Sequence, residues 1–347
     1  MSSFKHPGGD SLITDDYNVF KSVHPHPRYE KRLKLIAFKF KKGGMYTYTS
    51  DFAQNILKLN FDGSHIAPIE WWVRFGVLNA TLIYTEIAYI QQPTLVTSIA
   101  LGVVYALLGL CIGHDGSHGA VGNKYTNEFC SYYMDFIGNT NYAWHHQHIL
   151  QHHPYTNESD LDPDATSAEP FLVFDKERGH FSPINTLFTL ILGPSIVYDI
   201  SKLIPKFKIE TRRVIVSIVL RLYLFWKIFF VGYPFFGQIV VLTSGCILAL
   251  LFQVSHNTQE TKRNMLKDGS VDWYKNQVLS SSTYGGYTAG LVTGGLNYQI
   301  EHHIFPHMNS CYYPRISDTV RKICDSHGVR YTYYKSYSKN LMSFLKQ

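Results

Sequence analysis

The chain has 347 residues, of which only 17% are charged and 15% are aromatic, a balance that favours a chain lying partly in lipid over two ordinary soluble domains. Its net charge of +6 is modest for this length and its basic residues are scattered, so the composition gives nucleic-acid binding little support. The start of the chain has no apolar run of signal-peptide length, and we expect it to stay in the cytosol.

The cysteines are typical of thiols kept reduced in the cytosol, because they are odd in number and form no CxxC motif. A disulfide scaffold is therefore not expected. The five are Cys111, Cys130, Cys246, Cys311 and Cys324.

Four stretches approach the roughly 20 apolar residues that a helix needs to cross a bilayer. They are residues 71–90, 94–113, 213–230 and 237–256. The first and third contain charged residues and are weaker candidates than the others; buried helices of a soluble protein are the alternative. The short connections within the two pairs contain no Lys or Arg, whereas the longer segments outside contain many. By the positive-inside rule, the hairpin tips point away from the cytosol, and the termini and residues 114–212 lie in it.

A further apolar stretch at residues 183–200 contains Asn, Pro and Gly. We expect a helix that lies at the membrane interface there, since a fifth crossing would break the even count.

Two clusters of histidines follow the second stretch along the chain. The first, HDGSH, begins directly after it, and if the helix continues, His114 and His118 lie one turn apart and face the same way. The second, HILQHH, places His148 and His152 on one face of a helix, with His153 one step around it. Both clusters are expected on the cytosolic side, close to helix ends.

The remaining histidines of this kind follow the fourth stretch. His256 closes that stretch, and QIEHH places Gln299, His302 and His303 on one face of a helix at spacings of three and four residues. Independent surface histidines would have no reason to gather on one side of a membrane near helix ends. The pattern therefore indicates one shared site.

Neutral imidazole is a good ligand for iron, copper and zinc, and eight imidazoles exceed the needs of one tetrahedral zinc ion. Two ions of higher coordination number would use them all, and iron is favoured because an iron pair activates dioxygen. The carboxylates expected to fix the imidazole tautomers are Asp115, Asp160, Asp162 and Asp164.

The three boxes HDGSH, HILQHH with PYTNESDLDPD, and QIEHH resemble those of the membrane-bound fatty acid desaturases of the front-end type. The segments LNYQIEHHIFPHM, CYYPRISDTVRKICDSHGVRY and FQVSHNTQE are similar to that family too, so the resemblance covers residues 65 to 345. It implies iron ligands at His114, His118, His148, His152, His153, His256, His302 and His303. Gln299 stands where related desaturases have a histidine, so it is expected to coordinate directly, through water, or not at all.

The resemblance implies an all-α membrane protein with four transmembrane helices in two hairpins and a cytosolic helical cap that carries a di-iron site. The expected reaction uses dioxygen and two external electrons to place a cis double bond between an existing double bond and the carboxyl end of a polyunsaturated acyl chain. Box two is more similar to the delta-5 than to the delta-6 group. The endoplasmic reticulum is the expected membrane.

Other functions stay open at this point. A sphingolipid long-chain-base desaturase or a di-iron lipid hydroxylase would keep the same site, and a transporter or a zinc-dependent hydrolase would use the histidines differently. Whether the acyl group arrives on coenzyme A or on a phospholipid is equally open.

A second resemblance lies at the start of the chain. HPGG followed by DDYNVFKSVHPH resembles the haem motif of cytochrome b5, with His6 and His24 as the axial ligands. Only five residues precede HPGG, and the interval between the two histidines is short. We therefore expect a truncated domain at residues 1–30, as from an incomplete gene model, that does not hold haem alone. A separate cytochrome b5 and its NADH-dependent reductase would then deliver the electrons.

The expected organisation is completed by a linker at residues 31–64 and a desaturase domain at residues 65–347. The histidines outside the pattern are expected to be ordinary surface, core or neighbouring groups. They are His65, His145, His146, His180, His307 and His327.

Overall fold

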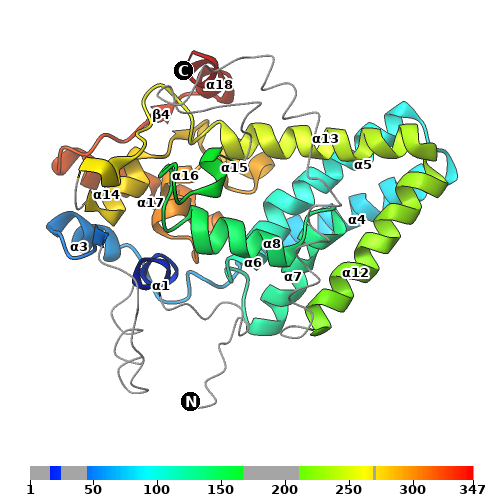
Figure 1. Cartoon of the computed structure of the whole chain (residues 1–347), viewed down its shortest axis with the longest axis horizontal. Helices are drawn as coiled ribbons and strands as arrows, with labels where there is room; N and C mark the ends of the chain where they lie inside the picture. Colours follow the sequence, from blue (N-terminus) through cyan, green and yellow to red (C-terminus); the bar gives the residue numbers. More distant parts are fainter. Residues whose placement is uncertain (1–15, 25–44, 167–210, 269–270, 347) are drawn as a thin grey trace.

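The computed structural model describes residues 16–24, 45–166, 211–268 and 271–346. Four long helices reach out to one side of the molecule, and short helices gather in a cap at the other side (Figure 1). The predicted interfacial helix at residues 183–200 and the HPGG motif lie outside the described residues. The described part of the chain is largely helical, as predicted, and its long and short helices are separated in space.

The long helices form where the apolar stretches were predicted. They are α4 (Ile69–Gln91), α5 (Leu95–Leu108), α12 (Thr211–Trp226) and α13 (Tyr233–Gln253). α5 continues through a π-helical turn into α6 (His114–Ser117), and α12 continues through a second π-helical turn, Lys227–Val231. α5 begins with a capping box in which Thr94 and Thr97 satisfy each other's backbone amides.

Three of these continuous helices are long and apolar enough to cross a membrane: Leu95–Ser117, Thr211–Val231 and Tyr233–Gln253. α4 has the length, but Arg74, Asn79 and Glu86 lower its apolar content. Length and composition thus support three of the four membrane crossings expected from the sequence.

α5 and α13 approach each other closely at Gly102. A methyl group at this position would lie 2.6 Å from Cβ of Thr243 and 2.7 Å from the carbonyl oxygen of Val240, so only glycine fits without a shift. This contact joins the second and fourth long helices.

Helices α7 to α9 connect the long helices to the cap. They are α7 (Lys124–Phe136), α8 (Asn141–Trp144) with the π-helix His145–His152 that follows it, and α9 (Pro163–Thr166). The Asn123 side chain begins α7 by accepting hydrogen bonds from the amides of Tyr125 and Thr126.

Within the described residues, the cap contains seven short α-helices and two pairs of two-residue strands. The helices are α1 (Tyr17–Val23), α3 (Asp51–Leu57), α14 (Trp273–Leu279), α15 (Gly286–Thr293), α16 (Gln299–Ile304), α17 (Tyr313–Ser326) and α18 (Tyr337–Leu345). β1 (Tyr46–Thr47) pairs in parallel with β2 (Val271–Asp272), and β3 (Thr283–Tyr284) with β4 (Tyr333–Tyr334). One apolar core packs the cap around α3, α14 and α16, and a second lies between the long helices and α7.

Candidate metal centre

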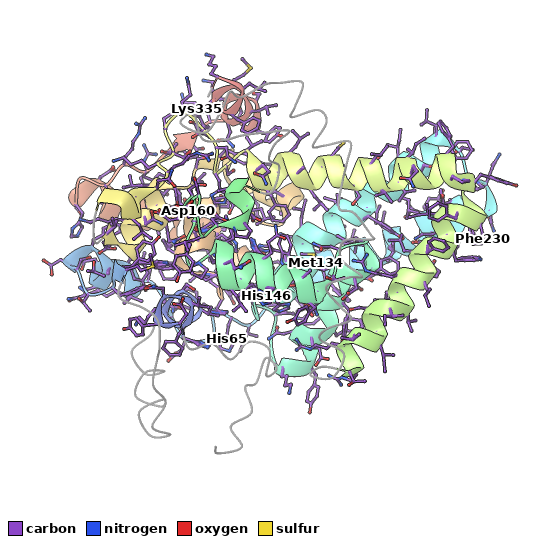
Figure 2. The ribbon with its side chains drawn as sticks, in the orientation of Figure 1. His65, Met134, His146, Asp160, Phe230 and Lys335 are labelled. Atoms are coloured by element: carbon purple, nitrogen blue, oxygen red, sulfur yellow. The ribbon has the colours of Figure 1, made fainter. Side chains whose placement is uncertain are left out.

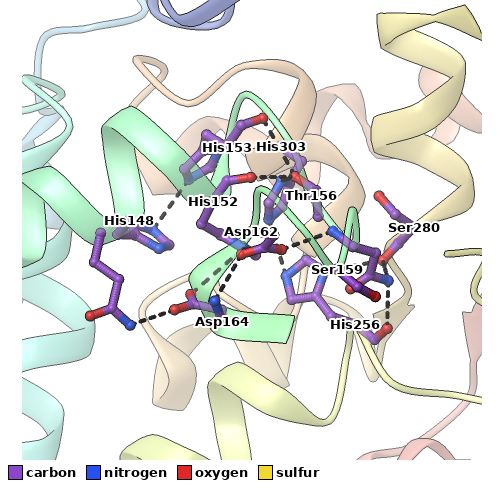
Figure 3. A network of polar contacts seen from close by, with 12 residues as sticks. His148, His152, His153, Thr156, Ser159, Asp162, Asp164, His256, Ser280 and His303 are labelled. Atoms are coloured by element: carbon purple, nitrogen blue, oxygen red, sulfur yellow. Dashed lines mark hydrogen bonds and ion pairs between the residues drawn. The ribbon is translucent and has the colours of Figure 1, made fainter. Parts of the chain in front are cut away.

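The histidine boxes meet where the long helices join the cap. Each box lies on a different element: the first on α6, the second on the π-helix after α8, and the third on α16. His256 follows the end of α13. All eight predicted ligands are buried, each with at most 7% of its surface exposed. Figure 3 shows five of them directed toward one another from three parts of the chain.

Four of these histidines form the first group of the centre. One ring nitrogen from each of His114, His118, His148 and His302 lies within 4.8 Å of the others. The ring centroids of His114 and His302 are 4.5 Å apart, and those of His118 and His302 are 4.8 Å apart. The group therefore combines all three boxes.

Three further histidines form the second group. His152, His256 and His303 have one ring nitrogen each within 4.8 Å of the others. The Nε2 atoms of His256 and His303 are 3.1 Å apart. Adjacent ligands of an octahedral ion with bonds of about 2.1 Å stand about 3 Å apart, so this spacing suits two ligands of one ion.

His153 lies between the two groups. Its ring centroid is 4.7 Å from that of His118 in the first group and 4.4 Å from that of His303 in the second. The second box thus contributes to both groups and holds them together.

The second box is a π-helix, and this changes which of its histidines meet. The amide of His153 donates to the carbonyl oxygen of His148, five residues earlier, at 3.1 Å. The Nε2 atoms of the same two residues lie 3.2 Å apart. An α-helix pairs His148 with His152, whereas the wider π-helical turn brings His153 beside His148 as well.

Hydrogen bonds at Nδ1 fix the orientation of four rings and leave Nε2 for a metal ion. Nδ1 of His152 lies 3.0 Å from Asp162, and Nδ1 of His256 lies 3.1 Å from the Ser280 carbonyl oxygen. Nδ1 of His302 lies 3.1 Å from the Tyr313 hydroxyl, and Nδ1 of His303 lies 2.9 Å from Gln277 Oε1. Of these partners, the sequence identified only Asp162. Gln277 and the Ser280 carbonyl lie 26 and 24 residues along the chain from the rings they orient, so no local spacing marks them. Tyr313 lies 11 residues from His302, but a single tyrosine carries no pattern that singles it out.

The Gln277 side chain has a defined orientation. Its Nε2 donates to the His153 carbonyl oxygen at 3.1 Å, and Thr156 donates to its Oε1 at 2.8 Å. Oε1 is therefore the acceptor for His303, whose Nδ1 carries the proton. One glutamine thereby ties the second box to the third.

Several ring nitrogens of the centre are buried without a protein partner. They include Nε2 of His114, His118 and His302, and Nδ1 of His118, His148 and His153. Buried polar atoms are rarely left in this state, and a bound metal ion would satisfy one nitrogen of each ring. The donor set and its burial therefore fit the transition metals that imidazole prefers.

Electrostatics keep most of these rings in the form that binds metal. Burial, reinforced by the neighbouring imidazoles, lowers the pKa of His118, His148, His153, His302 and His303 well below the ordinary value. Neutral imidazole is the ligand form, so the cluster disfavours protonation without help from metal.

His152 differs from the other rings. Burial lowers its pKa, but the carboxylates of Asp162 and Asp164 outweigh this and raise it to about 9. Asp162 is buried and also accepts the amides of Asn157 and Asp164. The carboxylate pair therefore makes His152 the most basic donor of the second group.

The other predicted acidic residues have different surroundings. Asp115 lies 3.9 Å from Nδ1 of His114 and accepts hydrogen bonds from Trp71 and Ser310, which anchors the first box to α4 and to the segment after α16. Asp160, labelled in Figure 2, is exposed. Asp115, Asp162 and Asp164 are thus the predicted carboxylates with a measured contact to a predicted ligand.

Gln299 lies in the centre. It is buried, its Oε1 has no hydrogen-bond partner, and it lines a small hollow together with His148, His152, His256 and Asp162. An unpaired amide oxygen among imidazoles can bind an ion directly or hold a water on it.

The other histidines in the described part of the chain belong to neither group. His146 is exposed and His145 bonds the Asn141 carbonyl oxygen. His24, one of the two predicted haem ligands, stacks on His307. Its predicted partner His6 lies outside the described residues.

Comparison with known proteins agrees with this geometry. A family model described as fatty acid desaturase matches residues 92–335. An acyl-lipid (7-3)-desaturase of Rebecca salina is 32% identical and the match covers 82% of this chain and 70% of the relative. A chloroplastic acyl-lipid (7-3)-desaturase of Chlamydomonas reinhardtii is 31% identical over 99% and 76% of the two chains.

An acyl-lipid (8-3)-desaturase of Mortierella alpina is 28% identical, with coverage of 78% of this chain and 71% of the relative. No solved structure matches the chain. The resemblance seen in the histidine boxes is confirmed by the family model, and the chain belongs to the fatty acid desaturase family, whose members are membrane-associated oxidoreductases acting on acyl lipids.

Proposed function

We propose that this protein is a front-end acyl-lipid desaturase. It inserts a cis double bond between an existing double bond and the carboxyl end of a polyunsaturated acyl chain. The observation that carries the proposal is the convergence of eight buried histidines, seven of them in two groups and His153 between the groups, within a chain whose relatives are named acyl-lipid desaturases.

The centre is proposed to hold two iron ions. The first group would hold one ion and the second group the other, with His153 and Gln299 completing the set. When bound, the iron pair supplies the reduction of dioxygen and the removal of two hydrogens from adjacent methylenes. Burial of every ligand supports this role, because a strongly oxidising site must exclude water and competing side chains.

The protein residues prepare the site for this chemistry. Asp162 and Asp164 hold His152 in the tautomer that presents Nε2, and Gln277 does the same for His303. Asp115 holds the first box against α4. These contacts fix the donors before metal binds, so little reorganisation is needed during the reaction.

The membrane arrangement is proposed to have four crossings, with α4 as the fourth. α4 packs along α5, and its Glu86 is paired with Lys227 inside the bundle instead of facing lipid. The sides of α4 turned outward carry exposed apolar residues such as Val77, Ile83 and Ile87. The cap would face the cytosol at the endoplasmic reticulum, where a separate cytochrome b5 and its NADH-dependent reductase provide electrons.

The regiochemistry is proposed to be of the delta-5 type, as box two indicates. Similar proteins include acyl-lipid (8-3)-desaturases and a Delta(5) fatty acid desaturase of Dictyostelium discoideum, beside the (7-3)-desaturases. The acyl chain is proposed to be carried on a glycerolipid, in keeping with the relatives' names.

Product analysis tests the proposal. Yeast expressing the chain is fed polyenoic acids of eighteen to twenty-two carbons in turn, and its fatty acids are profiled by gas chromatography and mass spectrometry. A new double bond on the carboxyl side of an existing one is the expected product. A hydroxylated acyl chain, or a change confined to sphingolipid bases, would instead identify one of the alternative di-iron functions.

A further inference from the structure

The N-terminal helix α1 packs on the cap beside the metal centre. The Asn18 side chain donates to the Tyr155 hydroxyl at 3.4 Å, and that hydroxyl donates to Asp16 at 2.8 Å. Tyr155 lies two residues after the second histidine box. These contacts fix α1 against the segment that carries the ligands, and they place His24, the residue that caps the end of α1, next to His307.

A continuous chain of contacts runs from His24 to the metal ligands. The rings of His24 and His307 are stacked, with centroids 6.0 Å apart and planes inclined by 17°. His307 Nδ1–H donates to the carbonyl oxygen of His118 at 2.5 Å. His118 belongs to the first ligand group, so two noncovalent contacts separate the His24 ring from a ligand residue.

Two hollows border this histidine pair among the described residues. Their volumes are about 330 Å³ and about 310 Å³, and both are lined by Val23, His24, Gly119 and His307. The second hollow also reaches His118 itself. Both imidazoles of the pair are only half-buried, in contrast to the ligands.

Other sides of the first group are covered in the described structure. The Trp144 ring stacks on His148 with centroids 4.3 Å apart, and Phe252 lies against His114 at 5.9 Å. Another protein therefore cannot touch these ligands from that direction. Electron transfer falls steeply with distance, and bonded or closely packed atoms carry it better than open solvent, so the half-buried pair offers a short route.

We propose that a one-electron carrier protein docks over the His24–His307 pair and passes electrons through it, by way of the His307–His118 hydrogen bond, to the metal centre. This inference rests on the proposed function, which needs an external reductant. The partner is a carrier with an exposed redox group. Two basic residues, Lys124 and Arg213, line the second hollow against one acidic residue, Glu128, and the chain is basic overall with a net charge of +6, so the matching face of the carrier is acidic. Electron carriers bind through small, transient interfaces, so a face limited to the surroundings of the two hollows is sufficient for such a partner.

The electron balance is that of the proposed reaction. Two reduced carriers each give one electron, and O₂, two protons and the CH₂–CH₂ unit become CH=CH and two waters. The imidazoles of His24 and His307 keep their oxidation state and act only as the medium between carrier and metal.

Rapid mixing tests the route. The iron-loaded full-length enzyme, in its oxidised form and without oxygen, is mixed with the reduced soluble domain of cytochrome b5, and haem oxidation is followed by absorbance. His307→Phe keeps a ring in the stack but removes the donor to His118, and His24→Ala removes the outer ring. His327→Gln is the control, because this half-buried cap histidine contacts Phe52 and lies outside the pair.

We expect His307→Phe and His24→Ala to slow haem oxidation by about tenfold. This is the lower end of the effect seen when a residue that supports a metal ligand is removed. His327→Gln should leave the rate unchanged. Iron content and the reduction of the centre by dithionite, a small reductant that needs no docking surface, should stay at the wild-type level in all three variants.

Two results would overturn the inference. An unchanged rate with cytochrome b5 in both variants excludes the pair as the route. Loss of iron, or equal slowing with dithionite, assigns the pair a structural role only. Failure of the wild-type enzyme to oxidise the carrier at all, by contrast, would count against the proposed function and not against this route in particular.

Discussion

The Nε2 atoms of His303 and His256 lie 3.1 Å apart, although 47 residues separate them in the chain. His256 lies just after α13, and His303 lies on α16 in the cap. The second ligand group therefore forms only when the last long helix is docked on the cap, so metal binding and tertiary structure should depend on each other.

Replacing His256 should empty one half of the centre. His256→Ala removes a member of the second group and should lower activity by more than about 100-fold, beyond the range caused by residues that only support ligands. Iron content, measured by plasma emission, should fall well below two ions per chain. His146→Ala is the control, since His146, labelled in Figure 2, lies beside the second histidine box but is exposed and belongs to neither group. Full iron content in His256→Ala would remove this residue from the ligand set.

The carboxylate behind His152 gives a second prediction. Asp162→Asn keeps the size of the side chain but removes its charge. The new NH₂ group takes the place of a carboxylate oxygen that accepts hydrogen bonds from Asn157, Asp164 or His152, so donor then faces donor. We expect activity or iron affinity to fall by about 10-fold to 100-fold. Asp160→Asn alters an exposed carboxylate two residues away and should change neither quantity. Equal behaviour of the two variants in iron titrations would contradict the role of Asp162.

The long helices could be predicted from the sequence, whereas the cap could not. The long helices were predictable because apolar runs of about 20 residues are a direct signal, and the helix of α5 does continue into the first box, as His114 and His118 required. The cap was not predictable in detail, because its short helices and two-residue strands are held by contacts between distant segments.

The site shows the same division. The ligand candidates could be named from spacing and family resemblance, but their grouping could not, because it depends on the π-helix that brings His153 beside His148. The buried acceptors Gln277 and Tyr313 carry no local signal. His307 was expected to be ordinary, and its stacking on His24 becomes visible only once α1 is docked on the cap.

Gln299 gives a third prediction. Its unpaired, buried Oε1 lies among the histidines of both groups, and Gln299→Leu removes that oxygen at similar volume. We expect activity to fall by about tenfold or more, with iron bound less tightly, because the amide oxygen completes the donor set. The measurements are iron retention during dialysis against a chelator and product yield. If both iron retention and product yield were unchanged, Gln299 would contribute packing volume only and not a donor atom.

The charged pair between the long helices gives the last prediction. Lys227 Nζ lies 2.5 Å from Glu86 Oε1, and the hydroxyl of Tyr105 donates to the same oxygen at 2.5 Å. The ammonium group also lies 4.4 Å from the centre of the Tyr105 ring. Both charges are almost fully buried, so each satisfies the other in a surrounding that cannot solvate it.

Lys227→Met leaves Glu86 without its counter-charge and should lower the free energy of unfolding by about 3–5 kcal/mol. The double variant Lys227→Met with Glu86→Gln removes both charges and should recover most of this loss, because an uncharged pair needs no compensation. Thermal unfolding of the detergent-solubilised protein measures both. If the double variant were as unstable as the single one, packing of the lysine stem between α4, α5 and α12, and not the charge pair, would be the source of the stability.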